Sequence, residues 1–209
     1  MKTIFCYGDS NTWGRIPESS GRYPFNARWT GILEKSLGSD YRIIEEGLNG
    51  RCSVWDEPFR PGRNGSVLLL PLLQSHAPLD LVILMLGTND ILHFRDHTAF
   101  DAARGIAVLL EIIQKSNTGV NGLPPPILLV SPPKIGPLSE GLRLKIHGQP
   151  EQSNDFARFY AMVAQSSRCH FLNAAEYCAP STLDGVHLDA AGHLGLAKGL
   201  IEKVPSCFN

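Results

Sequence analysis

The strongest constraint on the fold is a pair of short apolar runs without any alternation of polar and apolar residues. Residues 79–87 read LDLVILMLG, and residues 124–133 read PPPILLVSPP. Continuous apolar runs of this length are typical of strands buried on both faces of a parallel sheet. The prolines around the second run can continue neither a helix nor a central ladder, so they set its limits. The two runs therefore predict a parallel sheet with both faces covered.

Strand and helix patterns alternate along the rest of the chain. Residues 3–7 fit a first strand, and the longest helical pattern, at 99–115, places Ile106 and Leu109 on one stripe. The other strands and helices are predicted at 41–46, 169–174, 26–37, 154–166 and 190–203. Such alternation implies βαβ units with right-handed crossovers. We predict an α/β fold, a three-layer α/β/α sandwich with a mostly parallel sheet, in a single domain of residues 1–209.

Composition and charge argue against several classes of function. The 209 residues include 19 Lys or Arg and 20 Asp or Glu, a net charge of −1 without a basic block, which argues against nucleic-acid binding and a polybasic membrane patch. The apolar run is far shorter than the roughly 20 residues of a membrane helix, and the first residues do not fit a secretory signal. Five cysteines without a C-x-x-C pair argue against a disulfide framework or a zinc site. We expect a cytoplasmic protein.

Conspicuous polar clusters accompany the predicted strands. Gly-Asp-Ser at 8–10 follows the first strand, GLNGR at 47–51 the second, and GTND at 87–90 the third. The sequence DGVHLD at 184–189 precedes the last helix. Ligands of open α/β sheets bind beyond the carboxyl ends of the strands. The clusters therefore predict a functional site at that edge.

Ser10 is the candidate nucleophile of this site. A serine hydroxyl needs a base to take its proton and an acid to orient the base. His187 can be the base because Asp184 lies three residues before it, across the flexible Gly185. Asp189 is the rival acid, but it fits better as the N-terminal cap of the last helix. Taken alone, Ser10 would fit a helix cap equally well.

Acyl transfer also needs hydrogen-bond donors for the developing oxyanion. The candidates are the backbone N–H groups of Ser10 and Gly50 and the side-chain amide of Asn89. Gly50 would present an unobstructed backbone. Asp90 is expected to cap a helix or anchor a loop.

These motifs resemble a known family. Gly-Asp-Ser at 8–10, Gly50, GTND at 87–90 and D-x-x-H at 184–187 look like the four signature blocks of the SGNH (GDSL-type) hydrolases, in the same order and over nearly the whole chain. The surrounding phrases GDSNTWG, RWTGIL, EEGLNGR, LDLVILMLGTND and DGVHL further resemble the arylesterase/acyltransferase branch. The resemblance implies a flavodoxin-like fold, a Ser10–His187–Asp184 triad and an oxyanion hole.

Two residues depart from the family pattern. Asn11 stands where the tetrapeptide often has leucine, and Gly50 stands where the branch can carry alanine. Glycine and alanine both supply a backbone N–H, so the oxyanion role is kept. The segment does not fit the G-x-S-x-G elbow of α/β-hydrolases, because Thr12 occupies the last position.

The expected function is a serine esterase that hydrolyses small carboxylic esters through an acyl-enzyme, without a cofactor or metal, with acyl transfer to alcohols as an extension. A carbohydrate O-deacetylase or a thioesterase of the same fold is the alternative within the enzymes. A flavodoxin-like module that binds phosphate or a nucleotide at GDSNT, and an inactive scaffold, are the alternatives outside them.

The sequence also suggests where several other residues lie. Asp9, Asn11 and Trp13 are expected to border the substrate pocket, although Trp13 fits first-turn core packing equally well. His93 and His97 are expected on the solvated surface rather than as metal ligands, and His193 as a cap or a solvated residue of the last helix. Arg51 supports the floor of the site or pairs with Glu45 or Glu46.

Two long irregular stretches, 55–65 and 132–150, are expected to border the cleft, because function is often carried by loops. The second stretch has apolar side chains that would be awkward on the surface of a free monomer. They are Ile135, Leu138, Leu142, Leu144 and Ile146. These residues predict subunit contact in a homo-oligomer.

Overall fold

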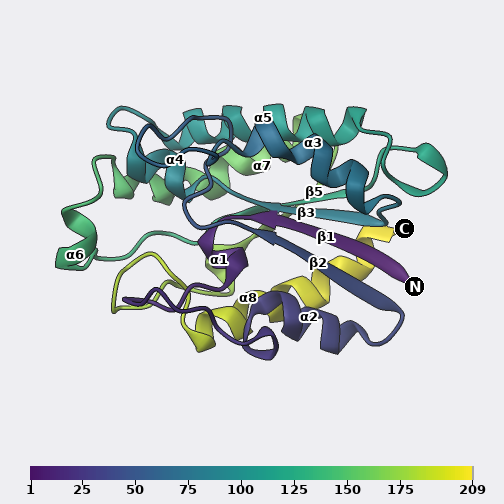
Figure 1. Ribbon diagram of the computed structural model, residues 1–209, viewed down its shortest axis with the longest axis horizontal. Coiled ribbons are helices and arrows are strands. Elements are labelled where there is room, and N and C mark those ends of the chain that lie inside the picture. The colour runs from purple at the N-terminus through teal and green to yellow at the C-terminus, as the bar shows by residue number, and fades with distance from the viewer. Residues whose placement is uncertain (209) are drawn as a thin grey trace.

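Five parallel strands form one sheet within residues 1–208, the part of the chain that the computed structural model describes (Figure 1). Asn209, the last residue of the predicted domain, lies outside it. The spatial order is β2-β1-β3-β4-β5, with β3 at the centre. The strands are β1 (Lys2–Gly8), β2 (Tyr41–Gly47), β3 (Leu81–Met85), β4 (Ile127–Ser131) and β5 (His170–Asn173). The predicted α/β fold with a parallel sheet is confirmed.

The central strands are buried on both faces. In β1, Phe5 and Tyr7 join one apolar core, while Ile4 and Cys6 join the other. The side chains of β3 divide in the same way, and all five of its residues are buried. Because successive side chains of a strand point to opposite faces, a strand between two cores is apolar at every position. This explains the continuous apolar runs.

Helices form one layer on each face of the sheet (Figure 1). The layer of α3 (Gly65–His76), α5 (Ala99–Lys115) and α7 (Phe156–Ser166) covers one face. The layer of α2 (Trp29–Leu37) and α8 (Ala190–Lys203) covers the other. The sandwich thus has two separate apolar cores.

Helix ends agree with the prediction where caps define them. The bounds of α5 and α8 are the predicted ones. Thr98 forms a capping box with Asp101 at the start of α5, and the Asp189 carboxylate accepts a hydrogen bond from the Gly192 N–H (2.8 Å) at the start of α8. The predicted helices at 26–37 and 154–166 each begin with a 3₁₀ turn, Phe25–Ala27 and Pro150–Asp155, before the α-helix.

Helix α3 was not predicted, because its sequence gives conflicting signals. Pro71 lies inside the helix, and Leu68 and Leu70 are exposed, so the apolar residues do not form a single stripe. Asn64 nevertheless caps its start by accepting a hydrogen bond from the Ser66 N–H (3.0 Å). Leu69 and Leu73 are its buried contacts with the core.

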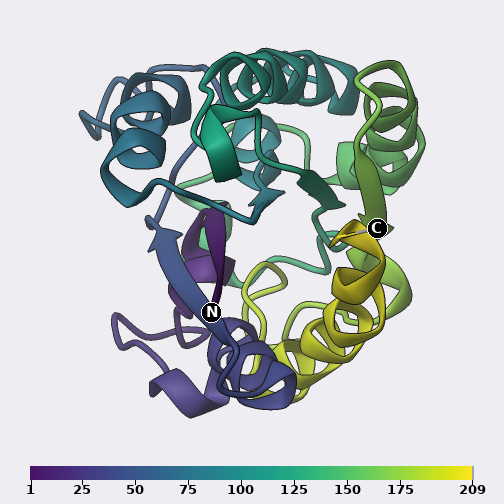
Figure 2. The same ribbon diagram turned by 90° about the vertical axis from the view of Figure 1, so that its right-hand side faces the viewer.

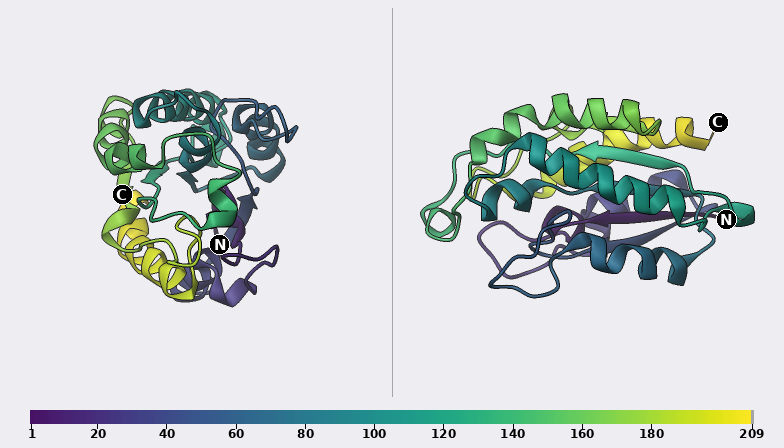
Figure 3. Two further views of the ribbon diagram at one scale, coloured as in Figure 1. Left: turned by 90° about the vertical axis from the view of Figure 1, so that its left-hand side faces the viewer. Right: turned by 90° about the horizontal axis from the view of Figure 1, so that it is seen from above.

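Three short helices gather at the carboxyl edge of the sheet. They are α1 (Ser10–Trp13), α4 (Thr88–His93) and α6 (Glu140–Arg143). The left panel of Figure 3 looks onto this edge, and Figure 2 looks onto the opposite edge, where the chain begins. The two predicted irregular stretches also reach the carboxyl edge, and α6 lies inside the second one.

His193 is placed differently from the prediction. It is fully buried between α8 and α2, where its Nδ1 accepts a hydrogen bond from the Trp29 N–H (3.4 Å), and the Tyr23 ring packs against its edge. Burial and the nearby charge of Arg28 lower the pKa of His193 to about 4. The expectation of a cap or a solvated side chain is wrong, because this face of α8 is packed against the neighbouring helix.

Three features are absent from residues 1–208. There is no disulfide, because all five cysteines there are free thiols. This part of the chain has no helix that is both long enough and apolar enough to span a membrane. Nor does it bring three or more His, Cys, Asp or Glu side chains together as a metal site.

Candidate active site

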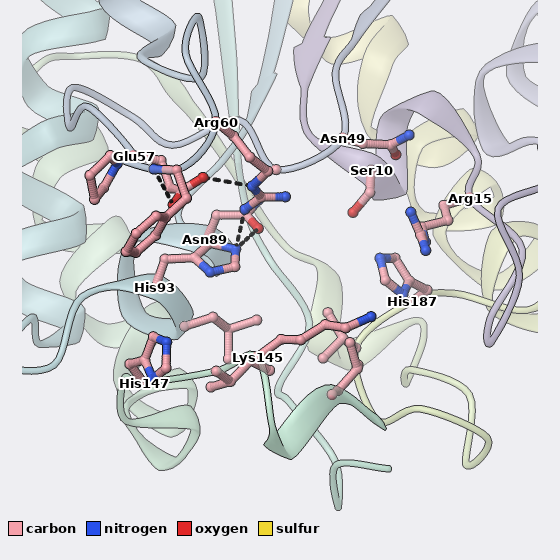
Figure 4. Close-up of a pocket in the computed structure, with 17 residues that line it drawn as sticks. Ser10, Arg15, Asn49, Glu57, Arg60, Asn89, His93, Lys145, His147 and His187 are labelled. Atoms are coloured by element: carbon pink, nitrogen blue, oxygen red, sulfur yellow. Dashed lines mark hydrogen bonds and ion pairs between the residues drawn. The ribbon is translucent and has the colours of Figure 1, made fainter. Parts of the chain in front are cut away.

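A cavity of about 470 Å³ opens at the carboxyl edge of the sheet (Figure 4). Four residues predicted for the chemistry line it: Ser10, Gly50, Asn89 and His187. Much of the remaining wall comes from the two irregular stretches, which contribute Glu57, Pro58, Phe59, Arg60, Leu142, Lys145, Ile146 and His147. The expectation that both stretches border the cleft is confirmed.

Ser10 is the first residue of α1, directly after β1. Asp9 caps this single helical turn by accepting a hydrogen bond from the Asn11 N–H (2.9 Å), and Gly14 ends it in the left-handed conformation. The turn is so tight that a Cβ at Gly8 would lie 2.0 Å from the Thr12 hydroxyl. The strand thus delivers the Ser10 side chain to the cavity in a fixed position.

Asp9 directly precedes Ser10 in the chain but lies outside the cavity lining. Its side chain is buried, and burial raises its pKa to about 6, against the lowering effects of the Asn11 N–H and of the His187 and Arg51 charges. Trp13 does not line the cavity either, since it is half-buried under the Arg22 guanidinium, 5.1 Å from its ring centroid. The structure therefore does not bring these two predicted pocket residues to the substrate.

Asn11 also lies outside the cavity, but it joins the two halves of the site. Its amide nitrogen donates to the Val186 carbonyl (3.2 Å), and its amide oxygen accepts from the Leu188 N–H (2.9 Å). Both bonds are buried and flank His187 in the sequence. An asparagine beside Ser10 therefore fixes the segment of the candidate base His187, which a leucine could not do.

Asn11→Leu is expected to lower kcat/KM for a small ester roughly tenfold and the free energy of unfolding by about 2 kcal/mol, because Val186 and Leu188 lose buried hydrogen-bond partners. Steady-state kinetics and urea unfolding measure the two effects. Asn26→Leu, the same change at an exposed position, is the control. Full activity in Asn11→Leu would contradict the positioning role.

Asp184 and His187 form a buried pair in the loop before α8. Asp184 Oδ2 lies 2.7 Å from His187 Nδ1, and Oδ1 accepts hydrogen bonds from the N–H groups of Val186 and His187 (both 2.9 Å). Burial disfavours the carboxylate, but the hydrogen bonds from His187 and Val186 together hold the pKa of Asp184 at about 2. The carboxylate thus stays ionised and engages Nδ1, leaving Nε2 as the free ring nitrogen.

Ser10 and His187 come together although they lie 177 positions apart in the sequence. Both side chains project into the cavity, and both are largely buried, at 6% and 8% exposed (Figure 4). Within residues 1–208 the Ser10 hydroxyl has no hydrogen-bond partner. Catalytic hydrogen bonds often form only when substrate is bound.

The candidate oxyanion donors surround the same end of the cavity. Asn89 is the second residue of α4, which Gly87 precedes as N-cap. Its amide nitrogen donates to the Arg51 carbonyl (2.9 Å), which leaves one amide hydrogen for another acceptor. Gly50 has a φ of 79°, in the left-handed region that favours glycine. A Cβ there would lie 2.4 Å from the Arg60 guanidinium, so alanine at this position would require Arg60 to move.

Arg51 supports the floor of the site. Its Nη1 donates to the Gly8 carbonyl (2.9 Å) and to the Glu46 carbonyl, and its guanidinium stacks on the Tyr7 ring. These contacts tie the ends of β1 and β2 together. Of the two alternatives for Arg51, the floor is confirmed, and its partners are backbone carbonyls rather than carboxylates.

Asp90 anchors a loop, as expected. It is fully buried, and it accepts hydrogen bonds from the backbone N–H (3.1 Å) and the hydroxyl of Ser53. Burial raises its pKa to about 7 in spite of these bonds. The anchor holds the start of the 55–65 stretch against α4.

A polar cluster on the cavity wall was not predicted. Arg60 bonds Glu57 (2.6 Å) and His93 Nε2 (2.8 Å), and His93 Nε2 lies 3.2 Å from the Asn89 amide oxygen (Figure 4). Burial and the Arg60 charge lower the pKa of His93 to about 4, so the ring is neutral. The expectation of a solvated His93 is wrong. His97 lies beyond α4 and stacks on Phe94 rather than sharing a helix face with His93.

The apolar side chains of 132–150 divide between several environments. Leu142 and Ile146 line the cavity, Ile135 packs against a core, and Leu144 is exposed. Three of the five thus have a place in the monomer. Subunit contact stays a prediction.

The chain is similar to known proteins in sequence and in fold. The model of the GDSL-like lipase/acylhydrolase family matches residues 6–194. Among solved structures, the native aryl esterase of M. smegmatis is similar with a TM-score of 0.93 and 36% sequence identity, over 99% of this chain and 100% of that chain. A carbohydrate acetylesterase from Sinorhizobium meliloti is similar with a TM-score of 0.92 and 36% identity, over 99% of both chains. A putative arylesterase from Agrobacterium tumefaciens has a TM-score of 0.91 and 35% identity, over 99% of this chain and 100% of that chain. A comparison with curated proteins gives no match.

Proposed function

Because the chain belongs to the GDSL-like lipase/acylhydrolase family and is a carboxylic ester hydrolase, we propose that Ser10, His187 and Asp184 are its catalytic triad. The observation that carries the proposal is the 2.7 Å bond between Asp184 and His187 Nδ1, in a loop that shares the cavity with Ser10. This bond directs the Nδ1 proton to the carboxylate. Nε2 is then free to accept a proton from the serine.

In the first half of the reaction, Ser10 Oγ attacks the ester carbonyl carbon while His187 Nε2 takes the hydroxyl proton. The carbonyl electron pair moves onto oxygen, which becomes the oxyanion of a tetrahedral intermediate. When the carbonyl re-forms, the bond to the alcohol oxygen breaks, and that oxygen takes the proton from Nε2. The alcohol leaves, and the acyl group stays on Ser10.

In the second half, water attacks the acyl carbon and gives a proton to Nε2. The bond to Ser10 Oγ then breaks, and Oγ takes that proton back. Asp184 stays ionised throughout and stabilises the imidazolium that forms twice. The backbone N–H groups of Ser10 and Gly50 and the Asn89 amide are proposed as the oxyanion donors.

The substrates we propose are small carboxylic esters. A cavity of about 470 Å³ suits a small ligand, and the similar aryl esterase and carbohydrate acetylesterase support short acyl groups. Leu92, Leu142, Ile146 and Val186 give the cavity an apolar wall. Such a wall disfavours water at the acyl-enzyme and supports acyl transfer to alcohols as a second fate. The similarity to the acetylesterase favours carbohydrate O-deacetylation as the second candidate.

A burst experiment with p-nitrophenyl acetate tests the function. Rapid mixing of enzyme and excess ester should release one p-nitrophenol per enzyme before the steady state, provided that deacylation is made slow by low temperature. Mass spectrometry of the quenched enzyme should find one acetyl group on the peptide that contains Ser10. A modified residue other than Ser10 would overturn the proposal.

The proposal extends to the setting of the enzyme. The five free thiols support a reducing compartment such as the cytoplasm. The exposed Leu144 and Phe59 beside the cavity support assembly of a homo-oligomer.

A further inference from the structure

The lining of the cavity carries an excess of positive charge. Three cationic side chains face it, Arg15, Arg60 and Lys145, against one carboxylate, that of Glu57. Glu57 is already bonded to Arg60 at 2.6 Å. With neutral histidines the lining therefore has a net charge of +2, in a chain whose net charge is −1.

Arg15 and Lys145 are the unneutralised cations. Within residues 1–208, neither has an acidic side chain within the 4.0 Å of a salt bridge. The Nε of Arg15 is also buried without a hydrogen-bond partner in the described chain. Buried charged groups are normally paired, so an unpaired guanidinium on a cavity wall favours an anionic ligand.

The position of these cations relative to the nucleophile indicates which part of a substrate they meet. In the close-up, Ser10 lies between two groups: Arg60, Glu57 and Asn89 on one side, Arg15 and His187 on the other (Figure 4). The Arg15 guanidinium and the Lys145 ammonium point toward His187. In the proposed reaction His187 protonates the leaving alcohol oxygen, so the alcohol portion departs on this side.

The backbone holds Arg15 close to the nucleophile. Its N–H donates to the Ser10 carbonyl (3.0 Å), directly after the left-handed Gly14 that ends α1. Lys145 comes from the opposite wall, where its N–H donates to the Leu142 carbonyl (2.9 Å). An anion held by both side chains would bridge α1 and the 132–150 stretch across the cavity.

We propose that the enzyme takes esters whose alcohol portion carries a carboxylate, that is, acylated hydroxy acids, and that Arg15 and Lys145 bind this carboxylate. The inference rests on the proposed function. A guanidinium can bind a carboxylate through two parallel hydrogen bonds, and the ammonium adds a second positive charge. Arg60 does not contribute to this preference, because Glu57 neutralises it. Arg15 and Lys145 are thus specificity-determining residues.

The test compares 2-acetoxypropanoate with 2-acetoxypropanamide, which replaces the carboxylate by a neutral group of the same shape. The measured quantity is the ratio of kcat/KM for the carboxylate to kcat/KM for the amide. Both reactions are monitored by the release of acetate at low ionic strength. Arg15→Gln is expected to lower this ratio about tenfold, and Lys145→Gln by a smaller factor because Lys145 is more exposed. Dividing by the amide value removes any general damage to the enzyme.

Two controls complete the design. Arg15→Lys keeps the charge, so it should recover most of the ratio that Arg15→Gln loses. Lys198→Gln removes a positive charge from an exposed position of α8 outside the cavity, and it should leave the parent ratio unchanged. A ratio that is the same in the parent, Arg15→Gln and Lys145→Gln would overturn the inference.

Failure of the inference can be told from failure of the proposed function. The function fails if p-nitrophenyl acetate does not acylate Ser10, whatever the preference between the two acetoxy substrates. The carboxylate site is then tested by calorimetric titration of the Ser10→Ala protein with 2-hydroxypropanoate and its amide. Tighter binding of the carboxylate that is lost in the Ser10→Ala, Arg15→Gln double variant supports the site, and equal binding of both compounds refutes it.

Discussion

Replacing Ser10 with alanine is expected to lower kcat for p-nitrophenyl acetate by roughly 10⁴- to 10⁶-fold, the range of loss when a serine nucleophile is removed. Among the described residues, Ser10 carries the only hydroxyl that lines the cavity. The remaining activity would come from substrate binding and oxyanion stabilisation, which do not need the hydroxyl. The p-nitrophenol burst should disappear completely, because no acyl-enzyme can form.

The matched control is Ser36→Ala, at an exposed position of α2 outside the cavity, which should keep the parent kcat and burst. Thermal unfolding followed by circular dichroism should give both variants nearly the parent Tm, because the Ser10 hydroxyl has no hydrogen bond to lose in the described chain. A Ser10→Ala protein that is folded and still shows a full burst would show that another residue is the nucleophile.

Asp184→Asn is expected to lower kcat by roughly 10⁴-fold with little change of shape. The asparagine amide can donate to His187 Nδ1, which favours the tautomer with the proton on Nε2. That tautomer cannot accept the proton of Ser10. Asp189→Asn is the control, because asparagine caps a helix as well as aspartate does and the parent activity should be kept. Equal losses in both variants would argue against Asp184 as the orienting acid.

The parent and Asp184→Asn are also expected to differ in how their stability depends on pH in acid. The pKa of Asp184 is lowered from 3.8 to about 2, so its ionised form stabilises the fold above pH 4 and this stabilisation is lost as the pH falls through 2. The effect amounts to roughly 2 kcal/mol. Asparagine does not titrate. The difference in unfolding free energy between parent and Asp184→Asn, measured by urea unfolding, should therefore shrink toward pH 2 and stay constant above pH 4.

Much of the fold was predictable because its signals are local. The two apolar runs identified the central strands β3 and β4, since burial on both faces removes polar residues from a strand. The start of α8 followed from Asp189, and the bounds of α5 followed from its helical stripe. Helix α3 was not predicted because Pro71 and the exposed leucines obscure its periodicity, and its buried contacts are made with residues distant in the sequence.

The candidate site was predictable only in part. Ser10, Asp184 and His187 belong to short motifs, and the types of these residues indicate a nucleophile, an acid and a base. The role of Asn11 depends on contacts with Val186 and Leu188, which lie 175 and 177 positions away in sequence. His93 was expected at the surface because nothing local indicates that Arg60 from another stretch covers it. Side chains that meet only through tertiary structure leave no periodic signal in a single sequence.

The residues proposed for the chemistry and the residues of the cavity wall come largely from different parts of the fold. This separation affects how the substrate preference of such an enzyme can change. Ser10, Gly50 and Asn89 stand directly beyond strands, and Asp184 and His187 are held by Asn11 and the start of α8. Residues 55–65 and 132–150 supply walls and charges but no strand of the sheet. Insertions, deletions and substitutions in these stretches can therefore reshape the cavity wall without moving the strand end that carries Ser10.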